Sequence, residues 1–188
     1  MTAPRKPGGT ALLILDMVSE FRFDDWRPTL RAARRIAPRI ALLKRRARAA
    51  RVPVFYVNDA PEDWDCDKAG LVTRACLSTA RGADVVRQVQ PSPGDIFVFK
   101  PRHSGFYATP MTELLERRRV RRLLLAGLTS HQCVLFTAVD AYVRDFELLV
   151  PADCIGAPRA RQTRDALRVL RDSLDAQTPL SASVRFAS

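Results

Sequence analysis

The chain alternates short apolar runs with longer stretches in which apolar residues recur every three or four positions. The short runs are typical of strands buried on both faces, and the longer stretches are typical of amphipathic helices. This pattern predicts strands at residues 11–15, 52–57, 96–99, 123–128, 147–150 and 183–186. It predicts helices at residues 29–51, 109–119, 131–144 and 157–174, with a loop and a helix over 60–80. Because Pro38 lies inside the first helical stretch, we expect a kink or a restart there.

Strands that alternate with helices predict a three-layer αβα fold with a mostly parallel, Rossmann-like sheet of five to six strands. Residues 1–10 are polar and rich in proline and glycine, so we expect a flexible N-terminal tail before a single domain over residues 11–188. Ligands of such sheets bind beyond the carboxyl ends of the strands. Residues that end a predicted strand are therefore the candidates for a functional site.

Three residues suited to chemistry occupy that edge. Asp16 and Lys100 each follow an apolar strand directly, and Cys133 opens the helix after another strand. The partial positive charge of a helix N-terminus favours a thiolate there. Taken singly, Asp16 could cap a helix, Lys100 could be a surface residue and Cys133 could be a small buried side chain. Taken together, they predict a nucleophile, its base and a cation.

This arrangement suggests hydrolysis through an acyl-enzyme. Asp16 would accept the thiol proton as general base, and Lys100 would hold Asp16 and stabilise the thiolate. Cys133 would attack a carbonyl carbon, and water would later release the acid. Backbone N–H groups near Cys133 would receive the oxyanion.

The segments that carry these residues resemble the isochorismatase-like cysteine hydrolase superfamily, which includes nicotinamidases, N-carbamoylsarcosine amidases and ureidoacrylate amidohydrolases. The resemblance runs from about residue 11 to residue 157. It is carried by residues 11–17 with Phe21, residues 99–106, residues 127–134 with 137–138 and 140–141, and residues 150–154.

The resemblance implies that Asp16, Lys100 and Cys133 form a catalytic triad. It also implies a cis peptide bond between Leu128 and Thr129, with the N–H groups of Thr129 and Cys133 as the oxyanion hole. The expected activity is cleavage of a C–N, amide-type bond of a small molecule. A homo-oligomer, dimer or tetramer, is a further implication.

Two departures from the family narrow the reaction. Nicotinamidases of the family bind a metal through an Asp-x-His pair, whereas residues 58–61 read Asn-Asp-Ala-Pro here. The two histidines, His103 and His131, lie in other motifs, so we expect no metal and no cofactor. Isochorismatases have glycine at the position of Cys133. The histidine at position 131, however, resembles isochorismatases at this turn. Vinyl ether hydrolysis of the isochorismatase type therefore stays an alternative.

Residues near these motifs are candidates for substrate binding. The aromatic candidates could equally pack the core, His103 could cap a loop and His131 could face another subunit. The candidates are Phe21, Asn58, Trp64, His103, Phe106, Tyr107 and His131.

The net charge of +11 raises a non-enzymatic alternative, a basic protein that binds nucleic acid or other anions. Arginine clusters occur at residues 44–51 and 117–122, but no aromatic residues are interleaved with them, so we expect no specific nucleic-acid partner. No apolar stretch reaches the roughly 20 residues that span a membrane. Without a signal-peptide pattern and without close cysteine pairs, the sequence predicts a cytoplasmic protein with free thiols.

Overall fold

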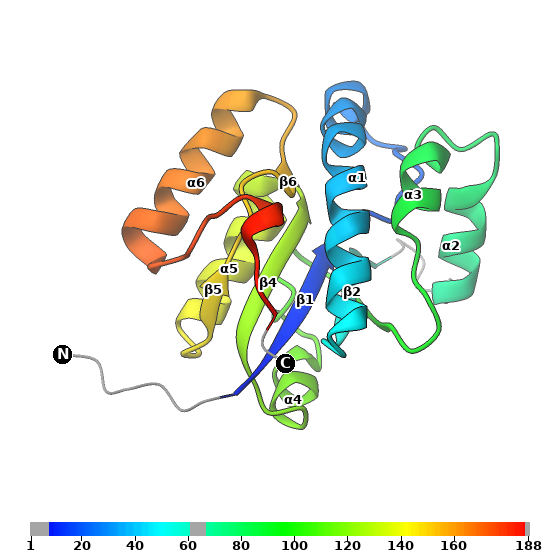
Figure 1. The fold of residues 1–188 in the computed structure, drawn as a ribbon. Helices are drawn as coiled ribbons and strands as arrows, with labels where there is room; N and C mark the ends of the chain where they lie inside the picture. The colour runs from blue at the N-terminus through cyan, green and yellow to red at the C-terminus, as the bar shows by residue number, and fades with distance from the viewer. Residues whose placement is uncertain (1–7, 61–66, 187–188) are drawn as a thin grey trace.

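The computed structural model describes residues 8–60 and 67–186, which form a sheet covered by helices on both sides (Figure 1). The strands are β1 (Gly9–Leu15), β2 (Val54–Asp59), β3 (Ile96–Lys100), β4 (Val120–Leu128), β5 (Glu147–Leu149) and β6 (Ile155–Gly156). The helices are α1 (Trp26–Ala49), α2 (Lys68–Cys76), α3 (Ala83–Val89), α4 (Met111–Glu116), α5 (Leu135–Tyr142) and α6 (Ala160–Leu174). A π-helical turn, Ser130–Val134, leads into α5.

The sheet is parallel and has the strand order β3-β2-β1-β4-β5. The short strand β6 pairs with the carboxyl end of β4, further along β4 than the residues that pair with β5. The first strand in the sequence, β1, is therefore central. Parallel pairing places the carboxyl ends of β1, β2, β3 and β4 at one edge. This confirms the predicted three-layer fold with its mostly parallel sheet.

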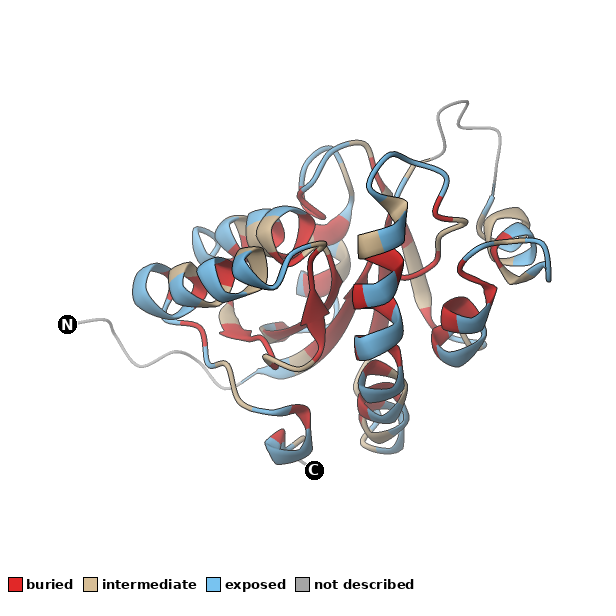
Figure 2. Ribbon diagram, turned by 90° about the horizontal axis from the view of Figure 1, so that it is seen from above, coloured by how far each residue is buried: buried red, intermediate tan, exposed pale blue. Residues whose placement is uncertain are grey.

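Alternating residues of the central strand serve two separate cores. Leu12 and Ile14 pack beneath α1, α2 and α3, whereas Leu13 and Leu15 pack with residues of α4, α5 and α6. Figure 2 shows the buried residues running through the sheet and along the inner sides of the helices. A strand buried on both faces reads as a continuous apolar run, which is why β1 was recognisable in the sequence.

Several boundaries differ from the prediction. β1 begins at Gly9, inside the predicted tail. α1 runs through Pro38 without a restart. Pro38 is exposed, so water can satisfy the carbonyl group that lacks a helical partner there. α3 and the two-residue β6 were not predicted, because both are too short to show a period.

The predicted last strand at residues 183–186 is wrong. The segment begins with a short 3-10 helix, Ser181–Ser183. The guanidinium group of Arg46 donates hydrogen bonds to the carbonyl oxygens of Ser181, at 2.8 Å, and of Val184. These carbonyl groups are thus engaged by a side chain of α1 and not by a neighbouring strand.

Among the helices of residues 8–60 and 67–186, none has the length and apolarity that crossing a lipid bilayer requires.

Candidate active site

Four chain segments meet at the carboxyl edge of the sheet. Asp59 ends β2 and pairs in register with Lys100, which ends β3. Asp16 follows β1 directly, and its N–H donates to the carbonyl oxygen of Val57 at 3.0 Å. The π-helical turn that carries Cys133 follows β4. Parallel pairing thus gathers side chains that are far apart in the sequence.

Gly127 allows β4 to approach β1 at this edge. Its φ is +120°, and a Cβ atom at this position would lie 2.1 Å from the carbonyl oxygen of Leu15. The backbone of β4 therefore reaches the end of β1 only because residue 127 has no side chain. Shortly after Gly127, the peptide bond between Leu128 and Thr129 is cis.

The ammonium group of Lys100 is the centre of the site. The side chain of Lys100 is fully buried, and its Nζ lies 3.0 Å from Asp16 Oδ2 and 3.4 Å from Cys133 Sγ. It also pairs with the carboxylate of Asp59. A buried ammonium group needs such partners because burial otherwise disfavours its charge. Burial does oppose the charge of Lys100, but Asp16, Cys133 and Asp59 together hold its pKa above the usual value.

The carboxylate of Asp16 faces both the cation and the thiol. Asp16 has a φ of 50°, so the chain turns away from the sheet as soon as β1 ends. Its Oδ1 accepts a hydrogen bond from the N–H of Asp59 at 2.9 Å. Its Oδ2 is buried and forms an ion pair with Lys100, and the carboxylate also faces the Cys133 thiol. The Oδ2 atom keeps a lone pair that can take a proton.

The electrostatics of the pair assign the resting proton to sulfur. Burial raises the pKa of Asp16 from 3.8 to about 6, with Lys100 opposing the shift and Asp59 adding to it. Burial and the charge of Asp16 raise the pKa of the Cys133 thiol above its usual range, against the effect of Lys100. The expectation that the helix start favours a thiolate is therefore not met. A neutral thiol beside an ionised carboxylate needs that carboxylate as its base.

Ligand atoms of Asp16, Asp59 and Cys133 lie within 4.8 Å of one another, a spacing that could hold a metal ion. The Nζ atom of Lys100 lies among the same three groups. Two cations at this spacing would repel each other strongly. The ammonium group therefore already supplies the positive charge that this cluster accommodates.

A pocket of about 970 Å³ lies at this edge of the sheet. Both Asp16 and Cys133 contribute to its wall. The Nδ1 atom of His103 lies 3.8 Å from Cys133 Sγ, and the ring of His103 contacts that of Phe136. The other residues that line the pocket include Glu20, Phe21, Arg22, Asn58, Asp59, Arg74, Leu128, Thr129, His131, Gln132 and Gln162.

The structure brings four of the seven predicted binding residues to this pocket: Phe21, Asn58, His103 and His131. Phe106 and Tyr107 are not among its lining residues, which corrects their assignment. Phe106 is buried in the core against Phe146, and Tyr107 is 58% exposed. The turn at Ser104, whose hydroxyl accepts from the N–H of Phe106, sends these rings away from the pocket. Trp64 lies outside the described residues.

Sequence reasoning missed two residues of the site. Asp59 entered only through the comparison of residues 58–61 with a metal-binding Asp-x-His pair, although it ends a strand beside Asn58 and pairs with Lys100. Its position beyond an apolar strand was a usable signal. Gln162, which contacts His131 at 3.1 Å, gave no signal because it lies 31 residues away on a different helix.

Comparison with known proteins agrees with this architecture. The chain is 35% identical over 167 residues to the uncharacterised isochorismatase family protein YaaI of Bacillus subtilis, covering 89% of this chain and 91% of YaaI. An isochorismatase family protein of Desulfovibrio vulgaris superposes with a TM-score of 0.75 at 26% identity, covering 94% and 96% of the two chains. The N-carbamoylsarcosine amidase of Thermoplasma acidophilum superposes with a TM-score of 0.70 at 25% identity, covering 94% and 99%.

The family model for the isochorismatase domain matches residues 10–181, nearly the whole chain. With the relatives above, this match shows that the chain belongs to the isochorismatase family.

Proposed function

We propose that the protein is a cysteine hydrolase that cleaves a C–N, amide-type bond of a small molecule. The observation that carries this proposal is the position of Lys100 Nζ, 3.0 Å from Asp16 and 3.4 Å from the Cys133 sulfur, with Asp16 and Cys133 both lining a pocket. The family includes the N-carbamoylsarcosine amidase described above, so the proposed bond type has a precedent in a structural neighbour. We place the enzyme in the cytoplasm.

The first half-reaction forms an acyl-enzyme. Asp16 takes the proton from Cys133 as the sulfur attacks the carbonyl carbon of the substrate. The N–H groups of Thr129 and Cys133 receive the oxyanion. When the C–N bond breaks, the protonated Asp16 gives its proton to the leaving nitrogen. A base with a pKa of about 6 is suited to both steps near neutral pH.

The second half-reaction restores the enzyme. Asp16, again ionised, takes a proton from water as the water oxygen attacks the thioester carbon. The C–S bond breaks, the carboxylic acid leaves, and the proton returns to the sulfur of Cys133. Lys100 keeps its charge throughout and holds Asp16 in place by the ion pair.

A screen of small amides with purified enzyme tests this function, with Cys133→Ala and Cys133→Ser beside the wild type. We expect both variants to fold and to lose turnover, because alanine offers no nucleophile and a serine hydroxyl is a much weaker acid and nucleophile than the thiol. Cys154 is a matched control, since it is buried but lies outside the residues that line the pocket. Cys154→Ala should keep turnover. Full activity of Cys133→Ala would contradict the mechanism.

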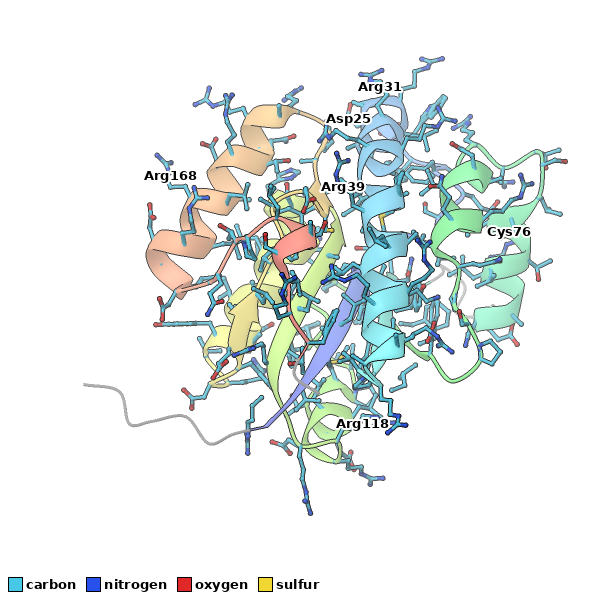
Figure 3. The ribbon with its side chains drawn as sticks, in the orientation of Figure 1. Asp25, Arg31, Arg39, Cys76, Arg118 and Arg168 are labelled. Atoms are coloured by element: carbon cyan, nitrogen blue, oxygen red, sulfur yellow. The ribbon has the colours of Figure 1, made fainter. Side chains whose placement is uncertain are left out.

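The same variants separate the alternative reactions. Vinyl ether hydrolysis would survive the loss of the thiol, because it needs no nucleophile on the enzyme. Nucleic-acid binding is less well supported, because the exposed arginines are spread over several elements: Arg31 and Arg39 lie in α1, Arg118 in the turn after α4 and Arg168 in α6 (Figure 3). Salt-sensitive DNA binding without thiol chemistry would favour that alternative.

A homo-oligomer, dimer or tetramer, remains part of this proposal. Phe136 and Val139 of α5 are exposed, as is Val143 directly after the helix, and the three are spaced as one face of a helix. Contiguous exposed apolar residues often mark a contact between protein chains. This face is where we would expect a second copy of the chain to pack.

A further inference from the structure

Two buried polar atoms in the pocket wall have no partner among the described residues: Asn58 Oδ1 and His131 Nδ1. Buried polar atoms in proteins are nearly always hydrogen-bonded, and an unpaired one costs free energy. Asn58 is only 4% exposed, so bulk water reaches it poorly. Atoms of this kind in a pocket wall are suited to pair with groups of a ligand.

The orientation of Asn58 is fixed by the chain. Its amide nitrogen donates a hydrogen bond to the carbonyl oxygen of Val18 at 2.8 Å. The reversed orientation would place two oxygen atoms against each other. Asn58 Oδ1 is therefore the free atom, and it can only accept a hydrogen bond.

The proton of His131 is fixed through Gln162. The N–H of Arg159 donates to Gln162 Oε1 at 2.9 Å, so the amide nitrogen of Gln162 faces His131 Nε2 at 3.1 Å. An amide nitrogen only donates, so His131 Nε2 must accept. Burial and the nearby His103 lower the pKa of His131, which keeps the ring neutral. Its one proton then lies on Nδ1, which makes the unpartnered atom a donor.

The charges around the pocket favour an uncharged ligand. Asp16 and Asp59 carry two negative charges against the single positive charge of Lys100, with a neutral thiol beside them. The arginines of the pocket wall, Arg22 and Arg74, are both paired with Glu20. A carboxylate buried near the triad would meet net negative charge, which is costly in a poorly solvated site.

We propose that the pocket selects an uncharged small amide that carries an N–H donor for Asn58 Oδ1 and a separate carbonyl or hydroxyl oxygen for His131 Nδ1–H. Asn58 and His131 are thus specificity-determining residues for the proposed hydrolysis, on which this inference rests. Gln162 is a positioning residue that acts through the tautomer of His131.

The tautomer can be tested without any substrate. The chain has two histidines, so ¹⁵N NMR of histidine-labelled protein gives few signals, and His131→Phe assigns them. We expect the neutral ring of His131 to carry its proton on Nδ1 at pH 7. A neutral ring protonated on Nε2 would overturn the assignment of the donor.

Selectivity can be tested by binding to the Cys133→Ala variant, which separates recognition from chemistry. The probes are small amides in four matched forms. The first carries an N–H donor and a separate carbonyl oxygen, and the second has that N–H methylated. The third lacks the separate oxygen, and the fourth has a carboxylate in place of that oxygen. We expect the first form to bind about tenfold more tightly than each of the others, because each loses one pairing or adds a charge.

Variants assign each preference to its residue. In the Cys133→Ala background, Asn58→Leu should remove the preference for N–H over N-methyl, and His131→Phe should remove the preference for the oxygen. Gln88→Leu, on the exposed side of α3, is the control and should change neither. Preferences that survive both variants, tighter binding of the carboxylate, or no binding of the first form would each overturn the inference. If the preferences hold but no amide is hydrolysed by the wild type, the proposed function fails and the assignment of specificity stands.

Discussion

Two buried lysines, Lys100 and Lys44, lie near opposite ends of β3, and the groups that surround them differ. Lys100 ends β3 at the pocket, whereas Lys44 of α1 meets Asp95, which directly precedes β3. Both side chains are almost fully buried. Both lie near carboxylates, so burial and an ion pair alone do not distinguish them.

The polar groups around Lys44 pair with one another. Lys44 Nζ lies 3.0 Å from Asp95 and donates to the carbonyl oxygen of Gln90 and to the hydroxyl of Ser92. Arg48 also pairs with Asp95. Burial lowers the pKa of Lys44 despite Asp95. Every group at this end is bound to another part of the chain, which is what a structural role requires.

The Lys100 cluster is left incomplete by the protein. The pKa of Lys100 is raised, because two carboxylates and a thiol surround its ammonium group. Two polar atoms of the nearby pocket wall, Asn58 Oδ1 and His131 Nδ1, have no hydrogen-bond partner within the described residues. Structural clusters close their hydrogen bonds internally, and functional clusters keep some groups for a ligand. We therefore propose a chemical role for the Lys100 end of β3 and a stabilising role for the Lys44 end.

The largest expected effect is on activity at the pocket end. Lys100→Met should lower kcat/KM for a hydrolysed amide by about 10³-fold or more, because Asp16 loses its ion-pair partner and faces Asp59 without a cation between them. Steady-state kinetics measure this, with circular dichroism to check the fold. A folded Lys100→Met enzyme with near wild-type kinetics would contradict a chemical role for the Lys100 end of β3.

A second prediction concerns pH. Asp16 must be ionised to act as base, so the rate should fall about tenfold for each pH unit below its pKa of about 6. Asp59 raises the pKa of Asp16, so Asp59→Asn should shift this acidic limb to lower pH. Asp84→Asn is the matched control, because Asp84 pairs with Arg34 at the surface. A limb that stays in place in Asp59→Asn would argue that Asp16 is not the group observed.

The smallest expected effect on activity comes from the other end of β3. Lys44→Met should destabilise the fold by about 1–3 kcal/mol, since Asp95 and the carbonyl of Gln90 lose a buried partner. It should leave kcat within about twofold. Urea unfolding and steady-state kinetics measure the two quantities. If Lys44→Met lowered kcat as strongly as Lys100→Met, the division of roles between the two ends would be wrong.

The sequence predicted what depends on strand ends. Asp16, Lys100 and Cys133 were identifiable because each follows or ends an apolar strand, and parallel pairing leaves such ends at one edge. Asn58 followed from the same argument. These residues are positioned by backbone topology, which the alternation of strands and helices already encodes.

The sequence could not predict what depends on side-chain direction or on pairs distant in the chain. Phe106 and Tyr107 lie next to a motif, but a local turn sends one ring into the core and the other into solvent. The contact between Gln162 and His131 joins two helical segments with no shared pattern. The raised pKa of the Cys133 thiol arises from burial and from Asp16, which the position at a helix start did not reveal.

The central claim is that Cys133 forms a covalent acyl-enzyme. Intact-protein mass spectrometry of the wild type, quenched during turnover of an amide found in the screen, tests it most directly. We predict a mass increase equal to the acyl group, located on the peptide that contains Cys133 and absent from Cys133→Ala. Turnover of that amide without any adduct, at full rate in Cys133→Ala, would contradict it.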